Sequence, residues 1–201
     1  MGVNWKEIKS ILQNFNAFYW NSEMVNNISL INDLRLSTNI HETAHSRILY
    51  KLLCAHGKEK HQFLKRFLES VGLDIELDIN KVEIKVESEH IDVLIYDGVK
   101  YIIVENKVNH ACDQDRQLVR YIDSLNSKDI YVLYLVRSDN DKDPSENSLP
   151  AEIRQELEEN GKYKKISYQT HIFNWLRKCK ETDTDNELLK SALVQYCNYI
   201  E

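Results

Sequence analysis

Two acidic residues and one lysine are spaced so that they could hold a metal ion beside a reacting water. Glu105 and Lys107 end the apolar run 101–104. Because alternate residues of a strand share a face, their side chains should project together. Asp92 lies on the preceding apolar segment, Ile91–Tyr96. Mg²⁺ is commonly bound through one or two carboxylates and keeps water ligands, and a neighbouring lysine can orient or deprotonate such a water. The three residues therefore predict metal-assisted hydrolysis.

The turn between the two segments decides whether Asp92 can reach Glu105. Asp97 and Gly98 form a dipeptide typical of tight hairpins. If they are the two turn residues, position 92 pairs with position 103, and Asp92 is a diagonal neighbour of Glu105 on one face. Carboxylates placed this way repel each other, and a divalent cation would remove that cost. An ordinary surface salt bridge is the alternative explanation.

A second pair with the same spacing serves as an internal control. Glu83 and Lys85 flank Ile84 in the alternating segment 82–86. That alternation predicts a half-exposed strand, and no aspartate on a hairpin partner accompanies the pair. We therefore interpret Glu83 and Lys85 as solvated.

Hydrophobic periodicity predicts the elements that position these residues. A helix begins after Asn39 and stops at Gly57. The later segments are predicted, in chain order, as helix 63–71, strands 82–86, Ile91–Tyr96 and 101–104, helix 118–125, strand Ile130–Val136, helix 149–160, strand 165–168, and helices 170–180 and 186–199. This order indicates an α/β (α+β) sandwich around a mixed sheet.

The first part of the chain has its own helical pattern. Apolar residues recur at helical spacing from Trp5 to Tyr19, and again over residues 24–34. We therefore expect an N-terminal helical extension over residues 1–36 and one domain over residues 37–201.

Composition restricts the partners and the compartment. The chain has 201 residues and a formal net charge of −6, so bulk binding of polyanions is excluded. Two basic blocks stand out: residues 43–68 carry a net charge of +5, and residues 161–180 carry +6. They could flank a phosphate-binding opening, or form the solvated faces of helices.

Membrane insertion and a disulfide framework are not expected. The longest apolar run, Ile130–Val136, has seven residues, far below the ~20 of a membrane helix. The N-terminus has no signal-peptide pattern, so we expect a cytoplasmic protein. The four cysteines are far apart and are interpreted as free thiols.

Asp92, followed by Glu105-Asn106-Lys107 on the next strand, resembles the PD-(D/E)XK nuclease superfamily. The resemblance covers roughly residues 40–178, and within the superfamily the chain is similar to one branch of small, mostly uncharacterised bacterial members. The segments that carry it are 42–46, 63–68, 91–95, 113–121 and 167–175. It implies a restriction-endonuclease-like αβββαβ core, with a mixed central sheet flanked by helices. It also implies hydrolysis of nucleic acid, expected to be DNA, with Mg²⁺ or Mn²⁺ as the cofactor.

The resemblance also implies roles for individual residues. Asp92 and Glu105 would be metal ligands, helped by the Asn106 carbonyl, and Lys107 would be the catalytic lysine. Gln117 would support the site from the following helix.

Two further positions carry open questions. Glu42 would approach the same metal as a further acidic residue. It also fits a capping box with Asn39, which is an independent explanation for a glutamate there. His90 stands where many relatives of this branch have an arginine, so a substrate contact at that position is in doubt.

Two other functions fit parts of the sequence. His41-Glu42-Thr43-Ala44-His45 matches the HExxH pattern, in which two histidines bind Zn²⁺ and the glutamate acts as the base of a metallopeptidase. No clear third zinc ligand follows this pattern in the sequence, and a zinc site would leave Glu105 and Lys107 unexplained. Alternatively, the chain is a nuclease fold that has lost activity and persists as a binding module. A homodimer is left open by the sequence.

Overall fold

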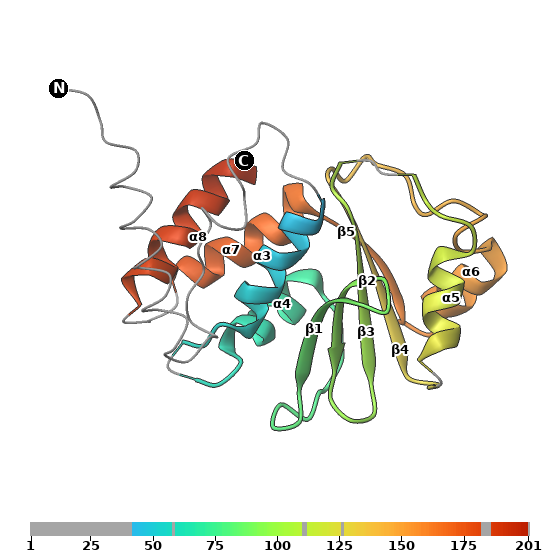
Figure 1. Cartoon of the computed structure of the whole chain (residues 1–201), viewed down its shortest axis with the longest axis horizontal. Helices are drawn as coiled ribbons and strands as arrows, with labels where there is room; N and C mark the ends of the chain where they lie inside the picture. The colour runs from blue at the N-terminus through green and yellow to red at the C-terminus, as the bar shows by residue number, and fades with distance from the viewer. Residues whose placement is uncertain (1–41, 58, 110–111, 126, 182–185, 201) are drawn as a thin grey trace, which may run out of the picture.

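The computed structural model describes residues 42–57, 59–109, 112–125, 127–181 and 186–200. The helices expected within residues 1–36, and also Asn39 and His41, lie outside these residues. The described part contains one five-stranded sheet with the strand order β1-β2-β3-β4-β5 (Figure 1). Strands β1, β2 and β3 are antiparallel, whereas β3, β4 and β5 run parallel. The mixed sheet confirms the predicted fold class.

The elements follow the predicted order closely. The strands are β1 (Glu83–Ser88), β2 (Ile91–Tyr96), β3 (Tyr101–Lys107), β4 (Ile130–Val136) and β5 (Tyr163–Ser167). The helices are α3 (Glu42–Cys54), α4 (Gln62–Val71), α5 (Gln117–Ser124), α6 (Ala151–Glu159), α7 (Phe173–Lys180) and α8 (Glu187–Ile200). A single wide π turn, Tyr168–Ile172, precedes α7. The helix predicted over 170–180 therefore begins later than expected, because this turn interrupts it.

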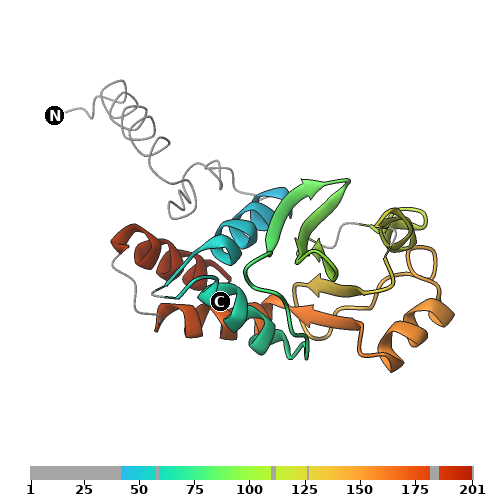
Figure 2. The same cartoon turned by 90° about the horizontal axis from the view of Figure 1, so that it is seen from below.

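Two helical layers cover the two faces of the sheet (Figures 1 and 2). Helices α3, α4, α7 and α8 lie on one face, and α5 and α6 lie on the other. This arrangement follows from strands that are apolar on both sides: successive residues of β3 join opposite clusters, as Ile102 and Ile103 do. The sheet is therefore a two-sided core element, and polar groups within it are exceptional.

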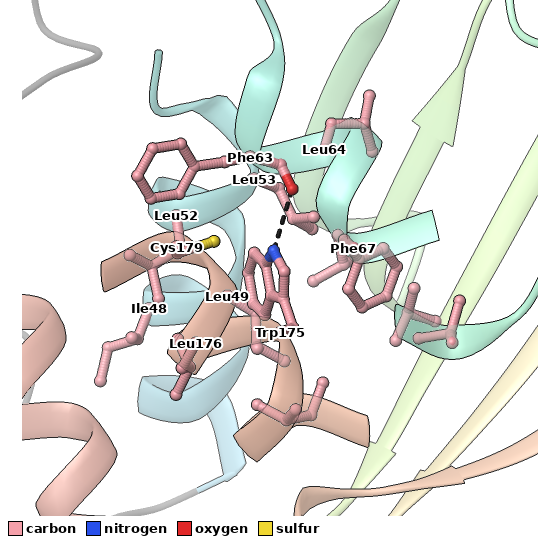
Figure 3. Packing of buried hydrophobic residues seen from close by; sticks show 14 of the residues in the cluster. Ile48, Leu49, Leu52, Leu53, Phe63, Leu64, Phe67, Trp175, Leu176 and Cys179 are labelled. Carbon is pink, nitrogen blue, oxygen red and sulfur yellow. Dashed lines mark hydrogen bonds between the residues drawn. The ribbon is translucent and has the colours of Figure 1, made fainter. Parts of the chain in front are cut away.

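The larger core lies between α3, α4 and α7. Figure 3 shows Trp175 among leucine and phenylalanine side chains, with its indole Nε1 donating to the Phe63 carbonyl oxygen at 2.9 Å. The ring of Trp175 also meets Phe67 edge to face at a centroid distance of 5.2 Å. The indole is thus buried with its one polar group satisfied, which fixes α7 on α4.

The turn between β2 and β3 differs from the prediction. Tyr96 pairs with Tyr101, so the turn is centred on Gly98 and Val99 rather than on Asp97 and Gly98. The Asp97 carboxylate accepts the backbone N–H groups of Val99 and of the following lysine, which holds Asp97 at the first turn position. Gly98 then takes the positive φ of 99°. The register moves by two residues, so the parity of the faces is kept.

Other expectations about the chain are also tested. The four cysteines are free, as predicted. Within the described residues, no helix is both long enough and apolar enough to span a membrane.

Candidate active site

The corrected register brings Asp92 opposite Glu105. The last pair of the β2–β3 ladder is Val93 with Val104, and the next step along an antiparallel ladder pairs Asp92 with Glu105. The backbone N–H of Asn106 donates to Asp92 Oδ2 at 2.8 Å, which fixes this carboxylate at the end of β3. The two acids are therefore direct rather than diagonal neighbours.

Glu105 and Lys107 point to the face covered by α5. Their partners on β4 are Tyr134 and Val136, whose side chains belong to the core on the α5 side. Only 2% of Glu105 and 6% of Lys107 is exposed. A glutamate and a lysine are almost never buried to this degree unless they are paired.

Gln117 completes a closed triangle with these two residues. Lys107 Nζ lies 2.8 Å from Glu105 Oε1. Gln117 Nε2 donates to the same carboxylate oxygen at 2.8 Å, and Lys107 Nζ donates to Gln117 Oε1 at 3.1 Å. The structure thus places Gln117, at the start of α5, in contact with both the lysine and the glutamate, and the supporting role that the resemblance implied for it stays a prediction.

Burial changes the acidity of the two carboxyl groups. It raises the pKa of Asp92 to about 6, although the Asn106 N–H opposes the shift. Burial also raises the pKa of Glu105 to about 7, and the neighbouring Asp92 charge adds to this. Burial alone would lower the pKa of Lys107, but Glu105, together with Asp113 and Glu42, outweighs burial, so the pKa of the ammonium group is raised. Both acids therefore hold their protons to a higher pH than an exposed carboxyl group does.

Glu42 lies at the start of α3, beside the end of β3. Its Oε1 accepts the backbone N–H of Asn109 at 3.1 Å, and its charge raises the pKa of Asp92. The Asn106 side chain donates to the Glu42 carbonyl oxygen at 3.2 Å and to the Ser46 hydroxyl at 3.0 Å. These bonds tie α3 to β3, so the structure brings Glu42 to the same strand end as Asp92.

The oxygen atoms at this strand end fit a hard divalent cation. Glu105 Oε2 is buried and has no hydrogen-bond partner within the described residues. It lies on the residue opposite Asp92, and carboxylate oxygens are the ligands that Mg²⁺ prefers. The described ranges contain no cluster of three or more His, Cys, Asp or Glu side chains arranged to hold a metal. A cation here would be held by two carboxylates, with a backbone carbonyl and waters as further ligands, as is usual for Mg²⁺.

Asp113 is a site residue that the sequence analysis did not single out. One of its oxygens lies 3.8 Å from Lys107 Nζ, and it accepts the Tyr134 hydroxyl at 3.1 Å. The other oxygen accepts the backbone N–H of Ser145 at 2.7 Å. Asp113 precedes α5 by four residues, and the only signal for it was its place within the segment 113–121 that carries the family resemblance.

Tyr121 was missed as well, although it lies one helical turn after Gln117. Gln117 Nε2 also contacts the Tyr121 hydroxyl, at 2.9 Å, and this hydroxyl donates to the His90 carbonyl oxygen at 2.7 Å. Glu89 and His90 both have positive φ, 54° and 68°. The spacing of four residues, which places side chains on one helix face, could have indicated Tyr121.

The zinc pattern is not assembled within the described residues. His41 lies outside them, and His45 is buried in the core. Its Nδ1 lies 2.7 Å from the Tyr196 hydroxyl, and burial lowers the pKa of the ring to about 4. His45 is therefore a neutral core residue that connects α3 to α8.

The control pair, and the parts of the basic blocks carried by α4 and α7, are separate from this site. Lys85 and Glu83 are 3.8 Å apart, with side chains 54% and 65% exposed, so the pair is solvated as predicted. Helices α4 and α7 carry part of the two basic blocks and pack together on the face opposite α5. There, Arg66 of α4 donates to the Lys178 carbonyl oxygen. Lys65, Arg177 and Lys180 on these helices are exposed, so the second interpretation, the solvated faces of helices, fits α4 and α7.

An αβββαβ arrangement with an acidic pair and a lysine on adjacent strands defines a nuclease-like fold. The model of the PD-(D/E)XK nuclease superfamily matches residues 32–198. Because this match spans most of the chain, the protein belongs to that superfamily. No curated protein and no solved structure matches the chain.

Proposed function

We propose that the protein is a Mg²⁺-dependent nuclease that hydrolyses phosphodiester bonds, with DNA as the expected substrate and Mn²⁺ as a substitute metal. The observation that carries this proposal is the buried contact between Lys107 and Glu105, opposite Asp92. A structural ion pair would not need a second carboxylate beside it. The two acids repel each other, and one oxygen of Glu105 has no hydrogen-bond partner within the described residues. A cation that both acids bind would explain both features.

Each residue then has a role that its contacts support. Asp92 and Glu105 would hold the metal, which when bound acidifies water and neutralises charge on the phosphate. Lys107 would orient the attacking water and stabilise the negative charge that develops on the phosphoryl oxygens. Gln117 would keep the ammonium group in place through its Oε1. Glu42 would act from α3, through Asn109 and the end of β3.

The protonation states support the same assignment. With pKa values of about 6 and 7, Asp92 and Glu105 carry protons in slightly acidic solution and lose them near neutrality. A metal that binds in their place would replace those protons. Lys107 stays charged because its carboxylate partners raise its pKa, so it acts as a donor and electrostatic stabiliser.

Cleavage assays test the proposal directly. Plasmid, linear duplex and single-stranded DNA, and RNA, are incubated with the purified protein in Mg²⁺, Mn²⁺, Ca²⁺ or EDTA. We expect cleavage with Mg²⁺ or Mn²⁺ and none with Ca²⁺ or EDTA, since Mg²⁺ demands near-octahedral geometry and Ca²⁺ coordinates more loosely.

Matched lysine variants separate the site from a contaminating nuclease. Lys107→Ala should abolish cleavage, whereas Lys85→Ala, in the solvated control pair, should leave it unchanged. Equal activity of wild type and Lys107→Ala would disprove the proposed site. Nucleic-acid binding with no cleavage in any metal would favour the inactive binding module instead.

A further inference from the structure

The loop that follows β4 is joined to the end of β5 and to the π turn after it by side chains that the proposed chemistry does not use. The Asp139 carboxylate accepts hydrogen bonds from the hydroxyls of Ser167 and Thr170. The Ser138 hydroxyl donates to Gln169 Oε1 at 2.8 Å, and the Gln169 backbone N–H donates to the Arg137 carbonyl oxygen at 3.1 Å. Four contacts thus join residues 137–139 to residues 167–170, which we call the strand-end platform.

The platform lies at the same edge of the sheet as the candidate active site. Lys107 pairs with Val136, and Val136 pairs with Ser167, so the three residues form one row across parallel strands. Adjacent strands are about 4.8 Å apart. The platform therefore begins one to two strands away from Lys107, at the carboxyl ends of the strands, where open α/β sheets bind their ligands.

Arg137 is the cation that this platform presents. Its side chain is exposed, and it makes no hydrogen bond or ion pair with any residue in the described part of the chain. Its backbone is held by Gln169. A guanidinium group matches the geometry of phosphate oxygens and can bind them with two parallel hydrogen bonds. An unpaired arginine on a braced backbone suits an anion that arrives from solution.

We propose that the strand-end platform binds the backbone of the nucleic-acid substrate beside the catalytic lysine. Arg137 would contact a phosphate, and Asp139 would position the platform that carries Arg137. This inference rests on the proposed function for the identity of the ligand. It adds a binding surface on β4 and β5 to a catalytic set carried by β2, β3 and α5.

Binding measured without cleavage tests the role of Arg137. Fluorescence anisotropy of a labelled 20-nucleotide DNA, single-stranded or duplex, in EDTA gives Kd for wild type and variants. Arg137→Ala should weaken binding by about tenfold and reduce the slope of log K against log salt by about one unit. Arg137→Lys should recover part of the loss.

Lys128→Ala is the matched control for charge. Lys128 is also exposed, and its substitution likewise removes one positive charge. It precedes β4, however, and lies about 30 Å from Arg137 along the strand direction. It should leave Kd within about twofold of wild type at the same salt concentration. An equal loss in Lys128→Ala and Arg137→Ala would overturn the inference, since net charge alone would then explain both.

Asp139 gives a test in which two explanations predict opposite signs. Asp139→Ala removes a negative charge, which by long-range electrostatics should tighten binding of a polyanion. If Asp139 positions the platform, the same variant should instead weaken binding several-fold, and Asp139→Asn, which retains hydrogen-bonding groups, should recover part of it. Glu152→Ala, an exposed acid on α6, is the control and should not weaken binding. Tighter binding by Asp139→Ala would overturn the positioning role.

The outcomes separate this inference from the proposed function. If wild type cleaves DNA and Arg137→Ala binds and cleaves like wild type, the platform is wrong and the nuclease stands. If no metal supports cleavage but Arg137→Ala and Asp139→Ala still weaken binding, the platform stands and the catalytic assignment fails.

Discussion

Lys107 Nζ lies 2.8 Å from Glu105 Oε1, with both side chains almost wholly buried, and a second carboxylate, Asp92, is opposite Glu105 on the neighbouring strand. One cation therefore lies beside two acids, of which Glu105 is buried and Asp92 is half-buried. Burying charges costs several kcal/mol per ion unless they are fully compensated. A contribution to the stability of the fold therefore does not explain this arrangement.

Replacing Glu105 by glutamine removes one charge and keeps the shape of the side chain. We expect Glu105→Gln to lower the cleavage rate at least ~100-fold, since the amide is a poor ligand for Mg²⁺ and no longer balances Lys107. Single-turnover kinetics with excess enzyme measures the effect, and circular dichroism checks that the fold is kept. Near-wild-type cleavage by this variant would remove Glu105 from the site.

The binding of Mg²⁺ should release protons and depend on pH in a defined direction. A carboxyl group must be ionised to bind the metal, and the pKa values of Asp92 and Glu105 are about 6 and 7. The affinity for Mg²⁺ should therefore rise between pH 5.5 and pH 8 and become constant above, with roughly one to two protons released per ion near pH 6. Isothermal titration calorimetry in two buffers of different ionisation enthalpy measures this number. A pH-independent affinity would contradict the assignment of both acids.

Asp92 should destabilise the metal-free protein at neutral pH. Its pKa in the folded protein is about 6 against an ordinary value of 3.8, so the folded state holds its proton more tightly than the unfolded state. The stability of the fold is then lost as the pH rises from about 4 to about 6, and it stays lower above. Asp92→Asn removes this loss and should increase the free energy of unfolding at pH 8 by about 1–3 kcal/mol.

If Asp92 is a metal ligand, Mg²⁺ should stabilise the wild type, and the same variant should abolish that stabilisation. Thermal or urea unfolding with and without Mg²⁺ at pH 5 and pH 8 shows both effects. Asp123→Asn is the control, because that aspartate side chain is 70% exposed and should change neither value. A less stable Asp92→Asn protein at pH 8 would show that the carboxylate is a structural group.

Gln117 should act through position rather than through substrate binding. Gln117→Ala leaves Lys107 and Glu105 with one partner fewer each and should lower kcat ~10–100-fold while KM changes little. Loss of buried hydrogen bonds should also cost about 1–3 kcal/mol of stability. Gln114→Ala is the control, because Gln114 is exposed and contacts Gln117 through its backbone N–H and carbonyl groups, which the substitution keeps. A change in KM with kcat unaffected would assign Gln117 to substrate contact.

The sequence predicted the strands and the shared face because both depend on local pattern. Glu105 and Lys107 are two residues apart on one strand, and alternation alone puts them together. The hairpin prediction missed the centre of the turn by one residue. The Asp97 carboxylate accepts the backbone N–H groups after Gly98, which favours a turn centred on Gly98 and Val99 over one centred on Asp97 and Gly98. The parity survived, since moving the centre by one residue changes the register by two.

Contacts made by α5 could not be derived in the same way. Gln117 reaches Glu105 because the helix packs over the strand end, a tertiary relationship with no local pattern, and only the family resemblance pointed to it. Asp113 is held between Lys107 and the backbone of Ser145, more than thirty residues away from it in sequence. The helix start at Glu42 was predicted from a cap whose first residue, Asn39, lies outside the described residues.

The charged residues of the candidate site lie close together in the sequence, and this affects the order in which parts of the protein fold. Asp92, Glu105, Lys107 and Gln117 fall within one stretch that spans the β2–β3 hairpin and the start of α5. Contacts of such short sequence separation form early, whereas the parallel pairing of β4 and β5 must wait for later chain. We therefore expect the repelling carboxylates to come together before the platform strands pair, with Lys107 as the nearest cation of the chain at that stage. The lysine to which we assign a role in hydrolysis would thus first serve as the counter-ion of the acids in the nascent hairpin.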